Sequence, residues 1–516
     1  MEAKRTLPIG IQTFRRIRED GCYYVDKTGH ALRLAGDAKH LFLSRPRRFG
    51  KSLFLDMLKE LFEGSEELFA GLEAHGRWDW SVRHPVVRLD FSGASFSAPG
   101  DLEDDLAAQL DALERQTGIV ARYERPAIRF RHLVRALCEK TGQRVVVLVD
   151  EYDKPVLDAL DNPELARANR EILRGLYSTI KFNDAQIKLT FLTGVSKFSK
   201  VSLFSGLNNL LDISLDPRYS TICGYTQRDL ETVFAPELAG LDAAAIREWY
   251  NGYSWSGTDK VYNPFDVLLL FKRRTFDAHW FETGTPSFLV KTLLEQGVGA
   301  ANLEGLRGTN ALLSSFDVDD IALEALLFQT GYLTIADVED RDGQPFFRLG
   351  YPNREVRQSL NDSLLKAMLP AAAHRLVSAA PLRDLLQAED FAGLEALLRT
   401  LLSGIPYNWH VNNNMAHFEG YYASVFYASF AAAGLDVRAE DATSHGRLDM
   451  AVLLGERVFL FEFKVSEAAP QGSALAQLKA RRYADKYRRG GKRIHLVGVE
   501  FSREQRNLTA FDVERA

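Results

Sequence analysis

The residues best placed to do chemistry lie in a hairpin that the sequence predicts over residues 447–465. Its two-residue loop, Gly455-Glu456, has glycine first, which is typical of a type II′ turn. Counting back from this loop pairs Asp449 with Glu462, and side-chain alternation places Lys464 on the same face as Glu462. Facing carboxylates repel each other unless a cation lies between them. This D…ExK pattern predicts a site for Mg²⁺ or Mn²⁺ at which Lys464 orients or activates water.

Such a site serves phosphodiester cleavage, because a metal ion there can generate hydroxide and stabilise charge on the phosphate and the leaving oxygen. The alternative is a solvated strand face on which the same residue types have no role. Apolar neighbours, Val458–Phe461 and Phe463, indicate that the hairpin is central in its sheet, and this favours the nuclease interpretation.

A second candidate site follows the predicted strand His40–Ser44. This strand runs into the loop SRPRRFGKS and then into a helix predicted over residues 52–63. In this setting a P-loop cradles phosphate with backbone N–H groups, Lys51 reaches the β- and γ-phosphates, and Ser52 ligates Mg²⁺.

The loop departs from the generic P-loop, because Arg45 stands five residues before Gly50, where that pattern has glycine. The extra arginines, Arg45 and Arg48, are expected to compensate in part by contacting phosphate. With Gly50, they complete the residues expected to bind nucleotide in this loop.

The predicted strand Val145–Asp150 supplies the acidic half of the nucleotide site. In a P-loop NTPase the first acid, Asp150, holds Mg²⁺ through water, and the second, Glu151, polarises the attacking water. The strand predicted over Lys188–Gly194 carries Thr193 near its end. Thr193 is either a sensor of the γ-phosphate or a structural hydroxyl.

Several longer motifs follow one another along the chain: LPIGIQTFRRIREDGCYYVDKT, SRPRRFGKS, LVDEYDKP, FLTGVSKFSKVSLFSGLNNL and WYNGYSW. Together they resemble the bacterial and archaeal AAA-ATPase-like family, whose members typically end in a PD-(D/E)XK nuclease-like domain. The arginine-rich loop without the first glycine is that family's own form. The resemblance covers nearly the whole chain and implies binding and hydrolysis of ATP. It also implies an additional acid, Glu419, on a helix predicted over Phe418–Phe430.

The same resemblance draws attention to a helix predicted over Ala474–Tyr487. In the nuclease superfamily a glutamine on this helix often completes the site, with a tyrosine four residues later. Gln477 matches the glutamine, but Arg481 holds the tyrosine position and Tyr483 comes two residues later. The helix and its exit carry basic residues, offset only by Asp485, that suit a nucleic-acid backbone or else form a solvated face. These are Lys479, Arg481, Arg482, Lys486, Arg488, Arg489, Lys492 and Arg493.

The elements that must position these sites predict an α/β multidomain fold in three parts. Residues 1–223 form an AAA-like P-loop ATPase domain with a mostly parallel sheet. Residues 224–404 form a helix-rich middle region, and residues 405–516 form a PD-(D/E)XK, restriction-endonuclease-like α/β domain. Further expected elements are a strand over Pro85–Phe91 and helices over Leu102–Gln116 and Leu382–Leu402.

The middle region contains a helix predicted over Leu323–Thr330. Two strands, Tyr332–Val338 and Phe346–Leu349, follow it around the turn Asp342-Gly343. This order fits either a winged-helix module or an ordinary helical domain with one hairpin.

The composition excludes several classes of protein. With 46% hydrophobic and 26% charged residues among 516, the chain is globular. Cys22, Cys138 and Cys223 lie far apart and form no CxxC pair, so neither a zinc finger nor a disulfide scaffold is indicated, and a reduced, cytoplasmic location is expected. The apolar runs are strand-sized, and the N-terminus lacks a signal-peptide core, so no membrane association is expected. The net charge of −5 leaves room only for a local nucleic-acid groove.

The leading hypothesis is a nuclease acting on nucleic acid, most simply DNA, that is driven or gated by ATP through a conformational or oligomeric change. Homo-oligomers fit this scheme. The alternative is a nucleotide-dependent switch whose C-terminal domain binds nucleic acid or a protein partner without cleaving. A third possibility is that the N-terminal domain binds nucleotide without hydrolysing it.

Overall fold

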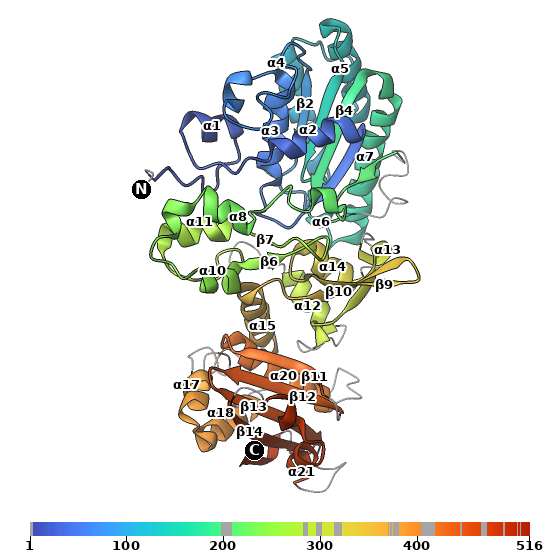
Figure 1. Cartoon of the computed structure of the whole chain (residues 1–516). Helices are drawn as coiled ribbons and strands as arrows, with labels where there is room; N and C mark the ends of the chain where they lie inside the picture. Colours follow the sequence, from blue (N-terminus) through green and yellow to red (C-terminus); the bar gives the residue numbers. More distant parts are fainter. Residues whose placement is uncertain are drawn as a thin grey trace. The chain divides into compact units, whose positions relative to one another are not determined.

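The computed structural model describes residues 4–516 except 198–208, 282–286, 296–301, 314–321, 370, 372–373, 375–380, 404–417, 444–445, 466–471, 489–490, 503 and 506. The chain forms two compact units (Figure 1). The N-terminal unit comprises Met1–Trp280 and Arg307–Asn353, and the C-terminal unit comprises Phe281–Leu306 and Arg354–Ala516. The region 224–404, which we expected as a separate part, is therefore shared between the two units.

A parallel sheet forms the centre of the N-terminal unit, with the strand order β2-β3-β4-β1-β5. Its strands are β1 (His40–Ser44), β2 (Val86–Asp90), β3 (Val145–Asp150), β4 (Ile187–Gly194) and β5 (Leu211–Asp212). Every residue of β3 is buried, as expected for a parallel strand covered on both faces. The four predicted strands are confirmed. β4 separates β1, which leads into the SRPRRFGKS loop, from β3, which ends in the acids.

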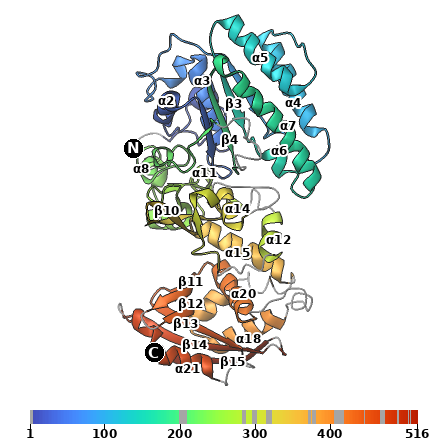
Figure 2. The same cartoon turned by 90° about the vertical axis from the view of Figure 1, so that its right-hand side faces the viewer.

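Helices cover both faces of this sheet, with α2 and α3 on one side and α5 and α7 on the other (Figure 2). The long helix α7 begins where Asn162 accepts a hydrogen bond from the Leu165 N–H, with proline at the next position. Its apolar residues recur at helical spacing and face the sheet. The helical elements here are α1 (Phe14–Glu19), α2 (Thr28–Asp37), α3 (Lys51–Glu63), η1 (Glu66–Phe69), α4 (Asp101–Thr117), α5 (Pro126–Thr141), α6 (Lys154–Leu157), α7 (Pro163–Phe182), η2 (Asp184–Gln186) and η3 (Pro217–Tyr219).

A small helical layer continues the same unit after the sheet. Its core packs Phe234, Tyr250 and Val267 against Tyr23 and Val25, which precede the sheet in sequence. The segment that precedes the sheet and this later segment therefore belong to one folded body. The elements are α8 (Gln227–Thr232), α9 (Ala235–Leu238), α10 (Ala243–Tyr250), β6 (Asn251–Tyr253), β7 (Val261–Tyr262) and α11 (Pro264–Arg273).

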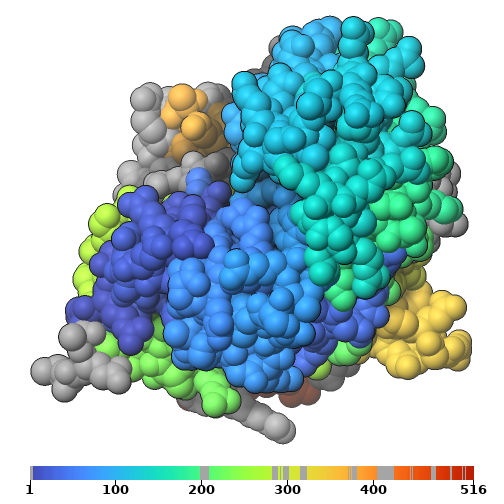
Figure 3. Space-filling model, turned by 90° about the horizontal axis from the view of Figure 1, so that it is seen from above, coloured from blue at the N-terminus to red at the C-terminus, as the bar shows by residue number. Residues whose placement is uncertain are grey.

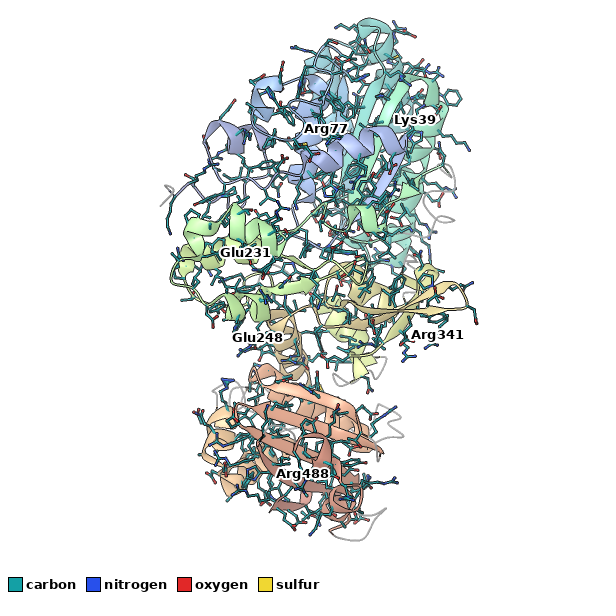
Figure 4. The ribbon with its side chains drawn as sticks, in the orientation of Figure 1. Lys39, Arg77, Glu231, Glu248, Arg341 and Arg488 are labelled. Carbon is teal, nitrogen blue, oxygen red and sulfur yellow. The ribbon has the colours of Figure 1, made fainter. Side chains whose placement is uncertain are left out.

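A three-stranded sheet of order β8-β10-β9 completes the N-terminal unit. Its elements are β8 (Arg307–Thr309), α13 (Asn310–Leu313), α14 (Leu323–Thr330), β9 (Thr334–Arg341) and β10 (Gln344–Gly350). A strand before the helices joins the hairpin after them, which is the order of a winged-helix module. However, α14 is buried over Ala325–Gln329. It therefore offers no exposed face of the kind that a recognition helix presents to a nucleic-acid groove. Arg341 lies toward the tip of the hairpin (Figure 4).

The C-terminal unit contains a mixed sheet of order β11-β12-β13-β14-β15. Its strands are β11 (Asp436–Thr443), β12 (Gly446–Leu454), β13 (Arg457–Val465), β14 (Arg493–Ser502) and β15 (Asn507–Arg515). β13 and β14 are parallel, and the other neighbours are antiparallel. The predicted hairpin is observed, with Leu454 paired to Arg457 across the turn.

Helices of the C-terminal unit correct two expectations. The single helix predicted over 382–402 is two helices, because Glu389 adopts a left-handed conformation with φ +56°. The helix predicted over 474–487 ends at Ala480, and Arg482 is left-handed with φ +49°. The helical elements are α12 (Ser287–Glu295), α15 (Arg354–Met368), α17 (Pro381–Ala388), α18 (Phe391–Ser403), α20 (Phe418–Ala432), α21 (Ser473–Ala480) and η6 (Tyr483–Lys486).

Candidate functional site

The loop between β1 and α3 curls around the ammonium group of Lys51. Lys51 Nζ donates to the carbonyl oxygens of Arg45 at 2.9 Å and of Pro46 at 3.1 Å, and the residue is 5% exposed. Gly50, with φ +93°, directly precedes α3, and Ser52 is the second residue of that helix and half-buried. Main-chain N–H groups at the start of a helix attract anions, so this loop has the parts of a phosphate cradle.

Arg45 does not extend into this cradle, which corrects the expected phosphate contact. Its side chain is fully buried, and its guanidinium donates to the carbonyls of Ser44 and Ser214 at 2.8 Å and of Tyr219 at 3.1 Å. It also lies over the Trp255 ring at 4.0 Å. Burial lowers the pKa of Arg45 to about 10. Arg45 therefore ties the loop to the segment after β5 and supports its backbone.

Aromatic residues from the segment after the sheet cover the outer side of the loop. The ring of Phe49 packs edge-on against Tyr253 at 4.7 Å, and Trp280 Nε1 donates to the carbonyl of Arg47 at 3.1 Å. Arg48 is exposed, has φ +67°, and places its guanidinium 4.9 Å from the centre of the Phe265 ring. Arg48 thus remains available to a ligand in a way that Arg45 is not.

The acids at the end of β3 are tied to neighbouring strands. The Thr193 hydroxyl, on β4, donates to Asp150 Oδ1 at 2.8 Å, which favours the structural reading of that hydroxyl. On the other side, Arg88 of β2 approaches Asp150 Oδ2 at 3.5 Å and pairs with Asp56 at 3.0 Å. Asp150 is fully buried. Sequence reasoning missed Arg88, although its place in an apolar strand was a signal.

Glu151, the next residue, has a left-handed backbone with φ +48°, a conformation that non-glycine residues hold at some cost. Burial raises the pKa of Glu151, while the nearby Lys51 ammonium opposes that rise. Asp153 was not foreseen either. Its buried carboxylate accepts the N–H of Val195 at 3.0 Å and the hydroxyl of Ser196 at 2.7 Å, which shapes the turn after β4.

A cavity of about 60 Å³ adjoins Gly50 and the first turn of α3. It has room for roughly four to six water molecules. Tyr24, Tyr225 and Ile222 are among its mostly apolar lining residues. Lys27 also lines it and donates to the Thr221 carbonyl at 2.9 Å, and burial lowers the pKa of Lys27. The cavity is a largely apolar space beside Gly50 and the start of α3.

In the C-terminal unit, Asp449 is anchored to the strand that carries Glu462 and Lys464. Strand pairs between β12 and β13 extend to Met450 and Phe461. Beyond them, the Phe463 N–H donates to the Asp449 carboxylate at 2.8 Å. One carboxylate oxygen of Asp449 is thus held against the backbone between the other two residues of the D…ExK pattern.

Glu462 lies at the centre of this second site. Its side chain is 1% exposed, Lys464 Nζ lies 3.7 Å from its Oε1, and the Gln477 amide donates to the same oxygen. The expected alternation is confirmed, because Phe461 and Phe463 pack under α20 on the other face of the sheet. The structure therefore brings Glu462, Lys464 and Gln477 together.

One backbone feature brings α21 close to Glu462, and another positions the tyrosine that follows the helix. Gly498 pairs with Glu462 across the β13–β14 ladder, and a Cβ atom there would lie 2.5 Å from the Leu475 nitrogen of α21. Only glycine admits the helix this closely. After α21 ends, the left-handed Arg482 turns the chain, and Tyr483 donates to the Arg447 carbonyl at 2.9 Å. Burial, and next the negative charge of Glu462, raise the pKa of Tyr483. Tyr483 therefore lies near Glu462, although it comes two residues later in the sequence than the family pattern predicts.

Glu500 is a further acid that sequence reasoning missed. It pairs with Lys464 in the parallel ladder, is 1% exposed, and accepts from the Ser473 hydroxyl and the Ala474 N–H at 3.3 Å each. A single acid inside the apolar run of β14 was its signal. Glu500 places a second carboxylate beside Lys464 and anchors the start of α21.

The expected basic groove beside this site is largely neutralised. Along the sequence only Asp485 opposes the basic residues, but acids from distant segments also pair with these side chains, and Arg489 lies outside the described residues. The pairs are Lys479–Glu514 at 2.8 Å, Lys486–Asp441 at 2.6 Å, Arg488–Asp485 at 3.1 Å and Arg493–Glu389 at 2.9 Å. Arg488 is exposed at the surface of the unit (Figure 4). This block is therefore weaker support for binding of a nucleic-acid backbone than the sequence indicated.

Oxygen donors at the second site suit a hard cation such as Mg²⁺, which proteins commonly hold through one or two carboxylates together with water and substrate phosphate. Asp449 and Glu462 fit that requirement. Within the described ranges, no three acidic, histidine or cysteine side chains converge on one point. Glu419 is the second residue of α20, and its side chain lies outside the described residues.

None of the described helices combines the length and apolarity needed to cross a bilayer.

Residues 8–204 match the family model described as "Predicted AAA-ATPase", and residues 417–511 match that of the "PD-(D/E)XK nuclease superfamily". Over 513 residues the chain is 57% identical to a protein of Azotobacter chroococcum mcd 1, with 99% of each chain covered. That relative is named "Uncharacterized protein in vnfD 5'region".

Proposed function

Because the chain belongs to the AAA-ATPase-like family that carries a C-terminal PD-(D/E)XK nuclease-superfamily domain, we propose that it is an ATP-binding, metal-dependent nuclease. In this proposal ATP occupies the N-terminal unit, and phosphodiester bonds are hydrolysed in the C-terminal unit. The observation that carries the nuclease assignment is the contact of Asp449 with the backbone between Glu462 and Lys464.

At the nucleotide site, Lys51 exchanges its two carbonyl contacts for phosphate oxygens, and the N–H groups that begin α3 bind the same phosphates. Ser52 and Asp150 hold Mg²⁺, with Asp150 acting through water, and Glu151 polarises the attacking water during turnover. Arg48 contacts phosphate from the exposed side of the loop. The base occupies the cavity lined by Tyr24 and Tyr225.

Nucleotide binding is tested with a fluorescent ATP analogue and the Lys51→Ala variant. Lys59→Ala is the matched control, because Lys59 lies on the same helix and pairs with Glu63 at 2.9 Å. We expect Lys51→Ala to lose binding and Lys59→Ala to keep it. ATP should also compete better than inorganic tripolyphosphate if the base occupies the cavity. Equal competition would exclude the cavity as the base site.

At the nuclease site, Asp449 and Glu462 hold the divalent ion, with Glu419 as a further acid. The bound ion supplies positive charge for the scissile phosphate and acidifies water. Lys464, whose side chain is 25% exposed, orients that water or stabilises charge on the phosphate. Gln477 fixes the Glu462 carboxylate through its amide, and Tyr483 closes the site from the turn after α21. DNA is the proposed substrate, by analogy with other nucleases of this architecture.

Metal binding at this site is tested apart from cleavage by titrating Mn²⁺ without nucleotide and measuring free Mn²⁺ by electron paramagnetic resonance. Glu462→Gln should remove one bound ion. Glu456→Gln, in the exposed turn of the same hairpin, is the matched control and should bind like the wild type. Equal Mn²⁺ binding by both variants would contradict the assigned ligands.

A further inference from the structure

Exposed large apolar side chains gather on one part of the N-terminal unit. Among the described residues, those most exposed are Val120 at 74%, Phe182 at 59% and Tyr123 at 48%. Val120 and Tyr123 lie in the loop before α5, and Phe182 is the last residue of α7, which packs against α5. Exposed rings grouped in this way mark a binding surface more often than chance exposure does. In Figure 3 the part of the chain that contains α5 (cyan to teal) is exposed on the face seen from above.

The ring of Phe182 is held in place although it is exposed. The guanidinium of Arg131 lies 5.0 Å from its centre and that of Arg135 lies 4.8 Å away. The next residue, Asn183, is fully buried, accepts from Arg135 Nε at 3.1 Å and donates to the Arg131 carbonyl at 3.2 Å. These bonds lock the end of α7 to α5. The ring is therefore a pre-positioned flat surface with two positive charges over it.

The arginines of this surface form no ion pairs with the residues that the structure describes. In the part of the chain that the structure describes, no carboxylate lies within 4.0 Å of Arg122, Arg125, Arg131 or Arg135. By contrast Arg129, on the same helix, is buried and pairs with Asp111 at 2.5 Å. Tyr123 extends the surface by contacting the ring of His132, at 5.6 Å between ring centres.

We infer that this surface, formed by Tyr123, Arg131, His132, Arg135 and Phe182 and here termed the platform, binds single-stranded nucleic acid. Exposed rings stack on unpaired bases of any sequence, and the flanking guanidiniums bind the phosphates between them. Several uncompensated arginines in a protein of net charge −5 favour a polyanion over an ordinary protein surface. The inference goes beyond the proposed function and does not depend on it, because binding here requires neither ATP nor cleavage.

The test measures fluorescence anisotropy of labelled single-stranded DNA, single-stranded RNA and duplex DNA, with EDTA and without nucleotide. Every protein carries Asp449→Ala, so that cleavage plays no part. The variants are Arg131→Glu with Arg135→Glu, and separately Phe182→Ala and Phe182→Trp. The control is Arg77→Glu with Arg83→Glu, which makes the same change in net charge at two exposed arginines of the same unit (Arg77 is labelled in Figure 4).

We expect the single strands to bind more tightly than the duplex. The Arg131/Arg135 double variant should lower the slope of log Kd against log salt by about 1.4, since each lost phosphate contact on a single strand accounts for about 0.7. Phe182→Ala should weaken binding at least about fivefold at high salt, and Phe182→Trp should restore it. All variants should keep the binding of the ATP analogue. The Phe182 variants and the control should also keep the thermal unfolding temperature, whereas the Arg131/Arg135 double variant should lower it slightly, because Arg135 no longer donates to Asn183.

Three outcomes would overturn the inference while leaving the proposed nuclease intact. The first is equal weakening by both arginine double variants, which would reflect bulk charge. The second is wild-type affinity in Phe182→Ala. The third is no binding of any oligonucleotide, which would leave the platform to a protein partner.

Discussion

The carboxylate of Asp449 accepts a hydrogen bond of 2.8 Å from the backbone N–H of Phe463, the residue between Glu462 and Lys464. Strand pairing between β12 and β13 extends only to Met450 and Phe461. The side chain of Asp449 therefore holds the two strands together one step further. Through this one contact the three residues of the D…ExK pattern keep fixed positions relative to one another.

Replacing Asp449 separates this structural role from the chemical one. Asp449→Asn keeps an oxygen that accepts the Phe463 N–H but removes the charge, whereas Asp449→Ala removes both. We expect both variants to lose cleavage. Only Asp449→Ala should speed hydrogen exchange at the Phe463 amide, because a lost bond of this kind is worth about 1 kcal/mol. Exchange followed by mass spectrometry checks this, and equal exchange in the two variants would contradict the anchoring role.

Gly498 offers a way to move Gln477 without changing it. In Gly498→Ala the new methyl group meets the Leu475 nitrogen at 2.5 Å, so α21 must shift away from Glu462. We expect cleavage to fall about 10- to 100-fold, the usual effect of removing a partner of a metal ligand. Gln477→Ala should cause a similar loss, and the double variant little more. Additive losses in single-turnover kinetics would mean that the two residues act independently.

Replacing Arg45 should affect stability, whereas replacing Arg48 should affect ATP binding, although both arginines lie in the same loop. Arg45→Ala leaves three carbonyls, including those of Ser214 and Tyr219, without their buried donor, at a cost of about 1–3 kcal/mol each. Differential scanning fluorimetry should therefore show a clearly lower unfolding temperature. Arg48→Ala should leave that temperature unchanged and weaken only ATP binding. An unchanged unfolding temperature in Arg45→Ala would contradict its supporting role.

The raised pKa of Glu151 sets a pH dependence for ATP turnover. Only the ionised carboxylate can polarise water, and burial keeps Glu151 protonated to a higher pH than an ordinary glutamate. Turnover should therefore fall on acidification at a pH above the usual glutamate range, while ATP binding persists. Phosphate release and analogue binding measured across the same pH series check this. If binding and turnover fall together, Glu151 is not the group that limits the rate.

Much of the fold could be predicted from local pattern. β1 and β3 match their predicted bounds because apolar runs of this length are buried strands in a parallel sheet. The hairpin register was predictable because its two-residue turn fixes the pairing, and Gly455 has the positive φ, +56°, that the first turn position needs.

Long-range contacts explain what local pattern missed. Arg45 was expected to contact phosphate because it lies in the loop before Lys51. Its actual partners are the carbonyls of Ser214 and Tyr219, which lie far along the chain and which no local pattern indicates. The basic block looked uncompensated because Glu514 and Asp441 approach it only through the sheet. Likewise, the position of Tyr483 depends on the left-handed backbone of Arg482. An arginine in the sequence does not indicate such a conformation.

The most direct measurement is cleavage of plasmid and of short single- and double-stranded DNA with Mg²⁺ or Mn²⁺, with and without ATP. The account predicts that the wild type cuts, that Asp449→Ala does not cut although it binds ATP, and that Lys51→Ala loses any stimulation by ATP. Cutting by Asp449→Ala would contradict the assigned site. No cutting of any substrate by the wild type, with ATP still bound, would contradict the nuclease assignment on DNA and favour a nucleotide-dependent switch.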